Sequence, residues 1–301
     1  MPPALRPALM RPRPSPPFDW LQGEVLDLRE RYEQAFRVED PGLNAWMNLP
    51  ADGRSLRLLR QQPARRRGAD AALLYFHGGG WIVGSPSTHA DISRRLCDRT
   101  GLDLISVDYR LAPEHQAPAP IEDGLAALIH LLSTGAGGLG RRSAILCGDS
   151  AGAAIALALE RRLEEPMRRQ VLGVGAFYGS YGLLEHLSSQ PWGSRAEGLD
   201  QGSVARYWRL AHGPAEPSPY AIGALAAPST VPAYLLAAAR DPLLPDSLAL
   251  AEAYRRCGRP FTLDLAEGVG HGFLHEANGS KPAAAALARV SAWIDGLIPS
   301  P

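Results

Sequence analysis

Gly148-Asp149-Ser150-Ala151-Gly152 lies between two segments whose residue types differ sharply. The preceding residues 143–147 form a short apolar run typical of a strand, and residues 153–159 form an alanine-rich run typical of a helix. A strand, G-x-S-x-G and a helix in this order predict a nucleophile elbow, with the serine on a sharp turn at the carboxyl end of a sheet. The same residues would also suit an ordinary strand-to-helix turn with a serine cap, so motifs elsewhere in the chain are needed to distinguish the two.

Strand-like runs and helical patterns alternate along the chain, which is typical of an α/β protein. Continuous apolar runs indicate strands buried on both faces of a sheet, and apolar residues at spacings of three and four indicate helices. The strand-like runs are 55–60, 71–76, 103–107, 171–177, 231–237 and 261–265, and the helix-like patterns are 19–37, 88–99, 121–133 and 282–298. This alternation predicts a mostly parallel central sheet with helices on both faces.

The chain of 301 residues is long enough for one large α/β core, and its composition suggests how that core is divided. Residues 1–60 are expected to form an amino-terminal arm and cap helices, because residues 1–17 are rich in proline and arginine. The core itself is expected at 61–180 and 228–301. Between them, residues 181–227 have weak periodicity and many Gly, Pro, Ser and aromatic residues, which predicts an inserted cap.

Charge and cysteine content argue against several classes of protein. Lysine plus arginine equals aspartate plus glutamate at 31 each, so no bulk charge favours nucleic acid or an anionic membrane as a partner. No apolar run approaches the ~18 residues of a membrane span, and the amino-terminal arm does not resemble a secretion signal. Cys97, Cys147 and Cys257 lack metal-ligand spacing and cannot all pair. We therefore expect a cytoplasmic protein without a bound metal.

A second motif indicates acyl-transfer chemistry and directly follows a strand-like run: His77-Gly78-Gly79-Gly80-Trp81. Acyl transfer through a serine creates negative charge on a carbonyl oxygen, and each backbone N–H aimed at that oxygen is worth about 3–4 kcal/mol. Glycines suit this role because they let the backbone approach a substrate closely. A phosphate-cradling loop and a plain tight turn are the alternatives. A G-x-G-x-x-G pattern occurs elsewhere, at Gly135, Gly137 and Gly140, but it follows a helix and precedes a strand, so we interpret it as a loop.

A base and an orienting carboxylate would complete a catalytic site. On folds with this elbow the acid and then the histidine follow the serine in chain order. Asp241 follows the apolar run at 231–239, and His271 lies just past the strand-like run at 261–265. Both are therefore expected at the same edge of the sheet as Ser150. The competing candidates, which we rank lower, are Asp246 and Asp264 for the acid and His275 for the base.

Together these motifs resemble those of the hormone-sensitive lipase family of esterases, in its bacterial branch. The similarity covers nearly all of the chain from about residue 70. The matching blocks are H-G-G-G at 77–80, D-Y-R-L-A-P-E at 108–114, G-D-S-A-G at 148–152, D-P-L at 241–243 and H-G-F at 271–273. Their joint occurrence in this order is highly specific.

The resemblance implies an α/β-hydrolase fold whose cap is assembled from the amino-terminal helices and the 181–227 insert. It also implies an oxyanion hole formed by the N–H groups of Gly78, Gly79 and Ala151. The block at 108–114 is structural in the family. No metal or organic cofactor is implied.

The sequence therefore predicts a serine carboxylesterase that acts through an acyl-enzyme, with Ser150 as nucleophile, His271 as base and Asp241 as the acid that orients it. By resemblance, the expected substrates are small esters with short acyl chains, and deacetylation of a small metabolite fits equally well. An amidase or formamidase and a thioesterase would use the same residues, so these alternatives stay open. A non-catalytic small-molecule receptor is disfavoured because His271 is present.

Aromatic residues in and beside the expected cap are the candidates for the substrate pocket. They are Trp81, Tyr178, Tyr181 and Trp208. An aromatic-lined pocket would favour small apolar esters, although aromatic residues in a small subdomain often form its own core. Homodimers through the last strand occur in such folds, but no residue of this sequence establishes one.

Overall fold

The structure is a computed structural model, and it describes residues 23–38, 44–133, 139–183, 199–212, 218–227, 229–276 and 280–298. Residues 1–22 of the expected arm and residues 184–198 of the expected cap insertion lie outside these ranges. So do Gly135 and Gly137 of the glycine-rich loop.

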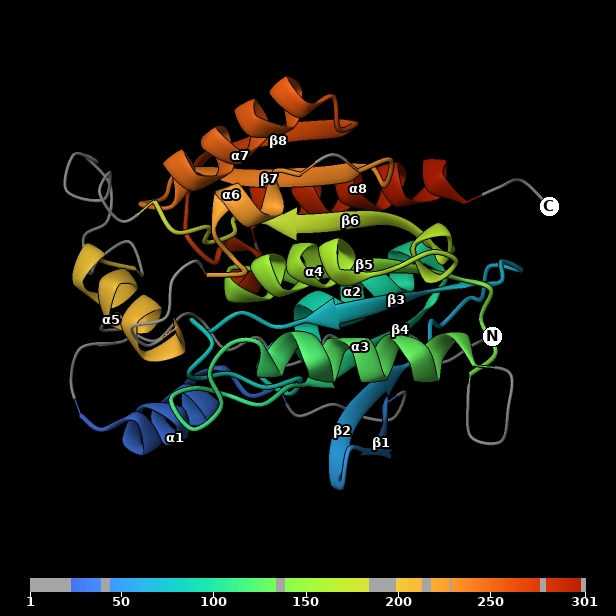
Figure 1. The fold of residues 1–301 in the computed structure, drawn as a ribbon, viewed down its shortest axis with the longest axis horizontal. Coiled ribbons are helices and arrows are strands. Elements are labelled where there is room, and N and C mark those ends of the chain that lie inside the picture. Colours follow the sequence, from blue (N-terminus) through green and yellow to red (C-terminus); the bar gives the residue numbers. More distant parts are fainter. Residues whose placement is uncertain are drawn as a thin grey trace.

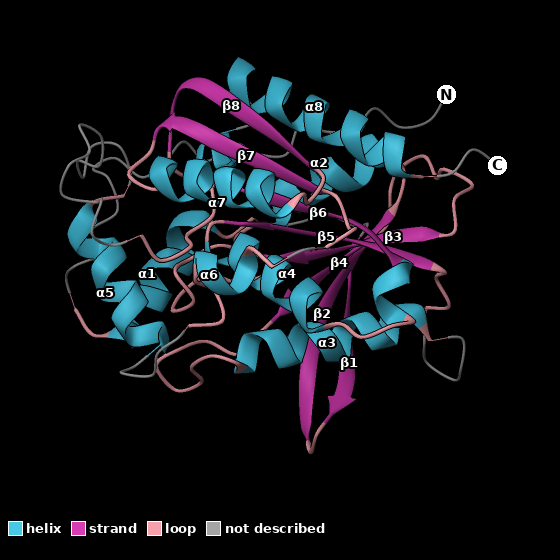
Figure 2. Cartoon of the chain, turned by 45° about the horizontal axis from the view of Figure 1, so that its top comes forward, coloured by secondary structure: helices cyan, strands magenta, loops and turns pink. Residues whose placement is uncertain are grey.

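One eight-stranded sheet forms the centre of the molecule (Figures 1 and 2). Its strands are β1 (Asn44–Ala51), β2 (Arg54–Gln61), β3 (Ala71–Phe76), β4 (Asp103–Asp108), β5 (Ser143–Asp149), β6 (Val171–Phe177), β7 (Ala233–Arg240) and β8 (Phe261–Gly270). They are ordered β1-β2-β4-β3-β5-β6-β7-β8. β1 pairs antiparallel with β2 and β2 pairs antiparallel with β4, whereas every pair from β4 to β8 is parallel. The predicted mostly parallel sheet is confirmed.

Helices cover both faces of this sheet (Figure 2). The helices are α1 (Val25–Phe36), α2 (Ala90–Thr100), α3 (Ala119–Leu132), α4 (Ala151–Arg162), α5 (Gln201–His212), α6 (Ile222–Leu225), α7 (Leu244–Cys257) and α8 (Lys281–Leu297), with the short 3-10 helices η1 (Met167–Gln170) and η4 (Phe273–Glu276). Helices α2 and α8 pack on one face, and α3, α4 and α7 pack on the other. The fold is therefore the α/β layering that the alternating pattern predicts.

Two apolar cores hold the layers together, one on each face of the sheet. Leu96 of α2 and Leu287 of α8 belong to one core, and Ile155 of α4 and Leu250 of α7 belong to the other; all four are completely buried. The six residues of β3 are also all buried. Burial on both sides explains why this strand reads as a continuous apolar run in the sequence.

Among the elements that the sequence patterns did not place are β1 and α7. β1 mixes polar and apolar residues, contains Pro50 and leaves Trp46 44% exposed. Such an edge strand has no clear period of its own and is set by its pairing with β2. α7 begins directly after the Asp241-Pro242-Leu243 motif, with Pro245 in its first turn, where a missing N–H costs little.

Helices α1 and α5 lie beyond the carboxyl ends of the central strands (Figure 1). The side chain of Arg206 in α5 donates a hydrogen bond to the Gly23 carbonyl at 2.8 Å, just before α1. Arg29 of α1 donates to the carbonyl of Ile82 at 2.8 Å and pairs with Glu114 at 2.6 Å. These contacts hold both helices over the loop that follows β3, in the position expected of a helical cap.

Candidate active site

Ser150, His271 and Asp241 meet at the carboxyl edge of the sheet. Ser150 lies between β5 and α4, Asp241 follows β7, and His271 follows β8. The Nε2 atom of His271 is 3.0 Å from the Ser150 hydroxyl oxygen, and its Nδ1 atom is 2.8 Å from Oδ2 of Asp241. The structure therefore joins the three expected side chains in one continuous hydrogen-bonded series.

The turn at Ser150 has the strained backbone of a nucleophile elbow. Ser150 has φ 53° and ψ −119°, outside the regions that non-glycine residues usually occupy. A Cβ atom on Gly148 would lie 2.3 Å from the Gly152 carbonyl oxygen, and one on Gly152 would lie 2.0 Å from the Phe76 carbonyl oxygen. Only glycines let the strand and helix approach so closely. The Ser150 amide donates to the Phe177 carbonyl at 2.8 Å, which fixes the turn against β6.

Asp241 is fixed in the orientation that a base requires of its partner. It is 1% exposed, and its Oδ1 atom accepts a hydrogen bond from the Leu243 amide at 2.8 Å. The other oxygen accepts the Nδ1 proton of His271, so the neutral imidazole presents its Nε2 lone pair to the Ser150 hydroxyl. The ring of Tyr178 packs edge-on against the imidazole, with centroids 5.1 Å apart.

The lower-ranked candidates have other partners. Oδ1 of Asp246 accepts hydrogen bonds from the amides of Tyr181 and Leu183, and burial raises the pKa of this carboxyl to about 7. Asp264 accepts hydrogen bonds from the Tyr234 hydroxyl and from Arg289. Neither carboxylate is bonded to His271.

The amide of Gly78 does not point toward the expected oxyanion. It donates to Oδ1 of Asp149 at 3.0 Å, so the structure does not support Gly78 as an oxyanion donor. Within the described parts of the chain, by contrast, the amides of Gly79, Gly80 and Ala151 donate no hydrogen bond. The error has a conformational cause, since the loop turns at Gly79 and Gly80, whose φ angles are 114° and 58°. The sequence shows three glycines but not which of them turn.

Gly80 is the residue of this loop that the sequence argument missed. A Cβ atom there would lie 2.5 Å from the ring of Tyr207 in α5. The cap helix therefore rests directly on the loop, and glycine is required both for the positive φ angle and for this contact. The 108–114 block contacts the same loop, because the Tyr109 hydroxyl donates a hydrogen bond to the His77 carbonyl at 2.7 Å.

The four aromatic candidates for the substrate pocket occupy different places. Tyr178 contacts His271, as described. Trp81 packs against Trp208, with ring centroids 5.6 Å apart, and stacks on Tyr220 at 5.1 Å. Trp81, Trp208 and Tyr181 are all buried, with at most 8% of each residue exposed. Trp81 and Trp208 thus pack into an aromatic core between the loop and α5, and the structure brings only Tyr178 of the four into contact with the triad.

A serine, histidine and aspartate in hydrogen-bonded series on an α/β sheet define a serine hydrolase. A family model described as alpha/beta hydrolase fold matches residues 73–275. The chain is 30% identical to the esterase LipI of Mycobacterium tuberculosis over 295 residues, covering 94% of this chain and 91% of that protein. The chain belongs to this α/β-hydrolase family, in the branch that resembles hormone-sensitive lipase.

Solved structures agree with this assignment. The hyperthermophilic esterase of the archaeon Pyrobaculum calidifontis superposes with a TM-score of 0.81 at 26% identity, covering 93% of each chain. The thermostable carboxylesterase EstE1, cloned from a metagenomic library, gives 0.79 at 25% identity, covering 92% of this chain and 99% of that one. Family and triad together identify the chain as a serine hydrolase that acts on carboxylic ester bonds. No helix in the described part of the chain has the length and apolar character that a bilayer crossing requires.

Proposed function

We propose that this enzyme hydrolyses small esters with short acyl chains, deacetylation of a small metabolite included, through an acyl-enzyme on Ser150. The observation that carries the proposal is the series Ser150–His271–Asp241, with its distances of 3.0 and 2.8 Å. These contacts are already within hydrogen-bond reach, so the nucleophile and its base need no rearrangement before substrate binds.

Acylation begins when His271 Nε2 accepts the Ser150 proton as the hydroxyl oxygen attacks the ester carbonyl. The imidazolium that forms is stabilised by the Asp241 carboxylate, which also keeps the Nδ1 proton in place. The imidazolium then protonates the departing alkoxide. A water molecule repeats the sequence on the acyl-enzyme and releases the acid. Every step uses side chains that the structure brings together.

The negative charge of the tetrahedral intermediate falls, in this proposal, to the amides of Gly79, Gly80 and Ala151. Ala151 is the first residue of α4, so its N–H belongs to the unpaired amino-terminal end of that helix, where the helix dipole also favours negative charge. Preorganised amides need no reorientation during the reaction, which is why such donors contribute strongly to catalysis.

The preference for short acyl chains is supported by the packing of the cap. Tyr207 of α5 rests on Gly80, and Trp208 packs on Trp81, so the loop that would hold the oxyanion is covered closely by aromatic side chains. Close cover beside the reacting carbonyl favours small groups. The names of LipI and EstE1, an esterase and a carboxylesterase, agree with ester rather than amide bonds.

Hydrolysis of aryl esters from acetate to laurate, with Ser150→Ala as control, tests the proposal. We expect the highest kcat/KM on acetate or butyrate and a loss of about 10³–10⁶ in the control variant. A matching acetyl anilide, formyl amide and acetyl thioester run in parallel distinguish an esterase from an amidase, formamidase or thioesterase. Faster turnover of the laurate ester would contradict the chain-length proposal, and faster turnover of an amide or thioester would contradict the ester preference.

A further inference from the structure

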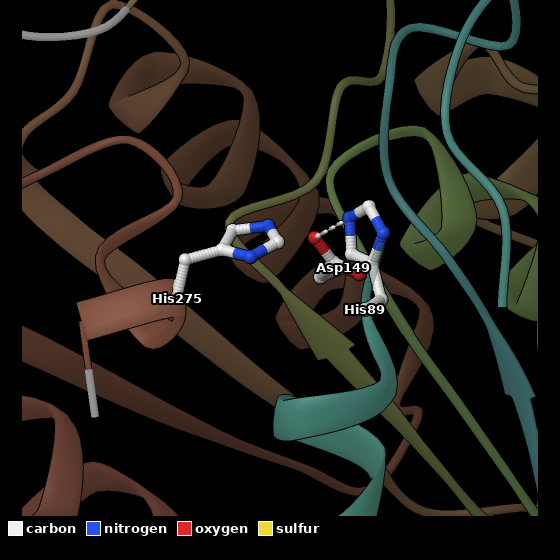
Figure 3. A group of neighbouring side chains, drawn as sticks. All are labelled: His89, Asp149 and His275. Atoms are coloured by element: carbon white, nitrogen blue, oxygen red, sulfur yellow. Dashed lines mark ion pairs between the residues drawn. The ribbon is translucent and has the colours of Figure 1, made fainter. Parts of the chain in front are cut away.

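A second histidine–aspartate group includes Asp149, the residue directly before the nucleophile. It consists of His89 just before α2, Asp149 at the end of β5, and His275 in η4. Each offers one nitrogen or oxygen atom, and among the described residues these three atoms lie within 4.8 Å of one another. Figure 3 shows the Asp149 carboxylate between the two imidazole rings. Three segments distant in sequence therefore converge on one point, which we call the second cluster.

The Asp149 carboxylate is held rigidly, with one oxygen facing the histidines. Its Oδ1 atom accepts hydrogen bonds from the Tyr75 hydroxyl at 2.7 Å and from the Gly78 amide at 3.0 Å. Its Oδ2 atom is 3.6 Å from Nε2 of His89. The carboxylate is 2% exposed, and these contacts fix its direction.

His89 turns its Nε2 atom toward Oδ2 of Asp149. This Nε2 atom is buried and has no hydrogen-bond partner among the described atoms. The Thr88 hydroxyl is 2.9 Å from the Ser85 carbonyl oxygen and 2.8 Å from Nδ1 of the same imidazole. When this hydroxyl donates to the carbonyl, its oxygen accepts a hydrogen bond from Nδ1, and Nε2 presents a lone pair that a cation shared with the carboxylate would stabilise.

We propose that His89, Asp149 and His275 bind a divalent cation of the zinc class. Two imidazole nitrogens and one carboxylate oxygen form a donor set that zinc prefers, with the fourth position open to water. Bonds of about 2.1 Å in a tetrahedron place ligand atoms about 3.4 Å apart. The His89 and Asp149 atoms are 3.6 Å apart, and all three ligand atoms lie within 4.8 Å of one another. The Thr88 contact fixes the ring of His89, as partners of zinc-bound histidines commonly do.

Burial differs among the three residues of the second cluster. His89 and Asp149 are buried, but His275 is only partly buried, so a metal ion would enter past the short helix η4.

A rival interpretation needs no metal. A protonated His89 would form an ion pair with Asp149 across the same 3.6 Å. In that interpretation neither His275 nor any other ligand holds a metal ion, so replacing His275 would not change zinc binding. The two interpretations differ in whether the protein binds zinc and whether His275→Gln weakens that binding.

Isothermal titration of ZnCl₂ into tag-free, chelator-treated protein tests the proposal directly. We expect one site per chain, with affinity weakened about tenfold or more by His275→Gln and by His89→Gln. His115→Gln removes an exposed histidine on the loop before α3 and should leave zinc affinity unchanged. His271→Gln should also retain the site, which separates the second cluster from zinc bound at the catalytic imidazole.

Three results would overturn the proposal: no zinc binding by the parent protein, unchanged affinity in His275→Gln, or loss of binding in His271→Gln. Because His89 is buried, its variant is compared with the parent by circular dichroism before titration. If it fails to fold, the partly exposed His275 decides alone. The parent protein should also gain thermal stability with zinc, and His275→Gln should not. The proposal is independent of ester specificity, since the readout is binding rather than turnover.

Discussion

Two histidine–aspartate groups flank the Ser150 turn, and their geometries differ. In the catalytic group, Asp241 accepts a hydrogen bond from His271 at 2.8 Å, and this contact orients the imidazole so that its Nε2 atom lies 3.0 Å from the Ser150 hydroxyl oxygen. In the second cluster, Oδ1 of Asp149 accepts a hydrogen bond from the Gly78 amide. Its Oδ2 atom lies 3.6 Å from Nε2 of His89, beyond hydrogen-bond distance. The same residue types thus form a continuous hydrogen-bonded series in one place and a group without a histidine–aspartate hydrogen bond in the other. The separation of the side chains and their hydrogen-bond partners, not their composition, distinguish the two groups.

The largest difference between the two groups should appear when a histidine is replaced. We expect His271→Gln to lower kcat by about 10³–10⁶, because no other group can accept the Ser150 proton. His275→Gln, measured on the same aryl acetate without added metal, should cost about tenfold or less. A comparable loss in both variants would show that His275 takes part in the chemistry and would remove the distinction.

Replacing each aspartate by asparagine should separate the groups next. Asp241→Asn can no longer hold the Nδ1 proton of His271, and we expect kcat to fall by about 10⁴. Asp149→Asn retains an oxygen that can accept from Tyr75 and Gly78, so a loss of about tenfold or less is expected. Pre-steady-state burst measurements would check that both changes act on acylation. A larger loss of kcat in Asp149→Asn than in Asp241→Asn would contradict this order.

A substitution in the loop at 77–81, whose Gly78 amide contacts Asp149, should lower kcat by a smaller factor. A methyl group at Gly80 meets the ring of Tyr207 and a positive φ angle, so Gly80→Ala should lower kcat by about 10²-fold through displaced amides. Trimming the ring with Tyr207→Ala in the same chain should restore part of that loss. Full activity in Gly80→Ala would contradict the predicted displacement of the loop.

The smallest expected effect concerns the stability of the fold and involves the buried carboxyl of Asp246. Burial raises the folded-state pKa of Asp246 to about 7, whereas the unfolded chain titrates near 3.8. The folded state therefore holds an extra proton between these values, and stability falls as pH rises from about 4 to about 7.

Asp246→Asn should remove that loss, by at most a few kcal/mol. Urea unfolding at pH 5 and pH 8 measures the effect as a smaller pH dependence in the variant. An equal pH dependence in both proteins would show that the pKa of Asp246 is not raised.

Much of the catalytic group could be predicted from the sequence because each motif directly follows a strand-like run. Parallel strands end at one edge of a sheet, so Ser150, Asp241 and His271 had to converge there once β5, β7 and β8 were placed. The choice between Gly78 and Gly80 could not be predicted, because it depends on the sign of φ at adjacent glycines.

The second cluster was missed for another reason. His89 and His275 lie in segments without a catalytic pattern, and the sequence suggests His275 only as an alternative base. Their approach to Asp149 depends on how α2 and η4 pack at the end of β5, which no local spacing reveals. The identity of Asp149 within G-D-S-A-G was the available signal, since a buried carboxylate requires partners.

Reaction with a fluorophosphonate, followed by peptide mass mapping, tests the central claim most directly. We expect one adduct per chain, located on Ser150, formed rapidly in the parent protein and at least about 10³-fold more slowly in His271→Gln. An adduct on another residue, or labelling of Ser150 at the parent rate without His271, would contradict it.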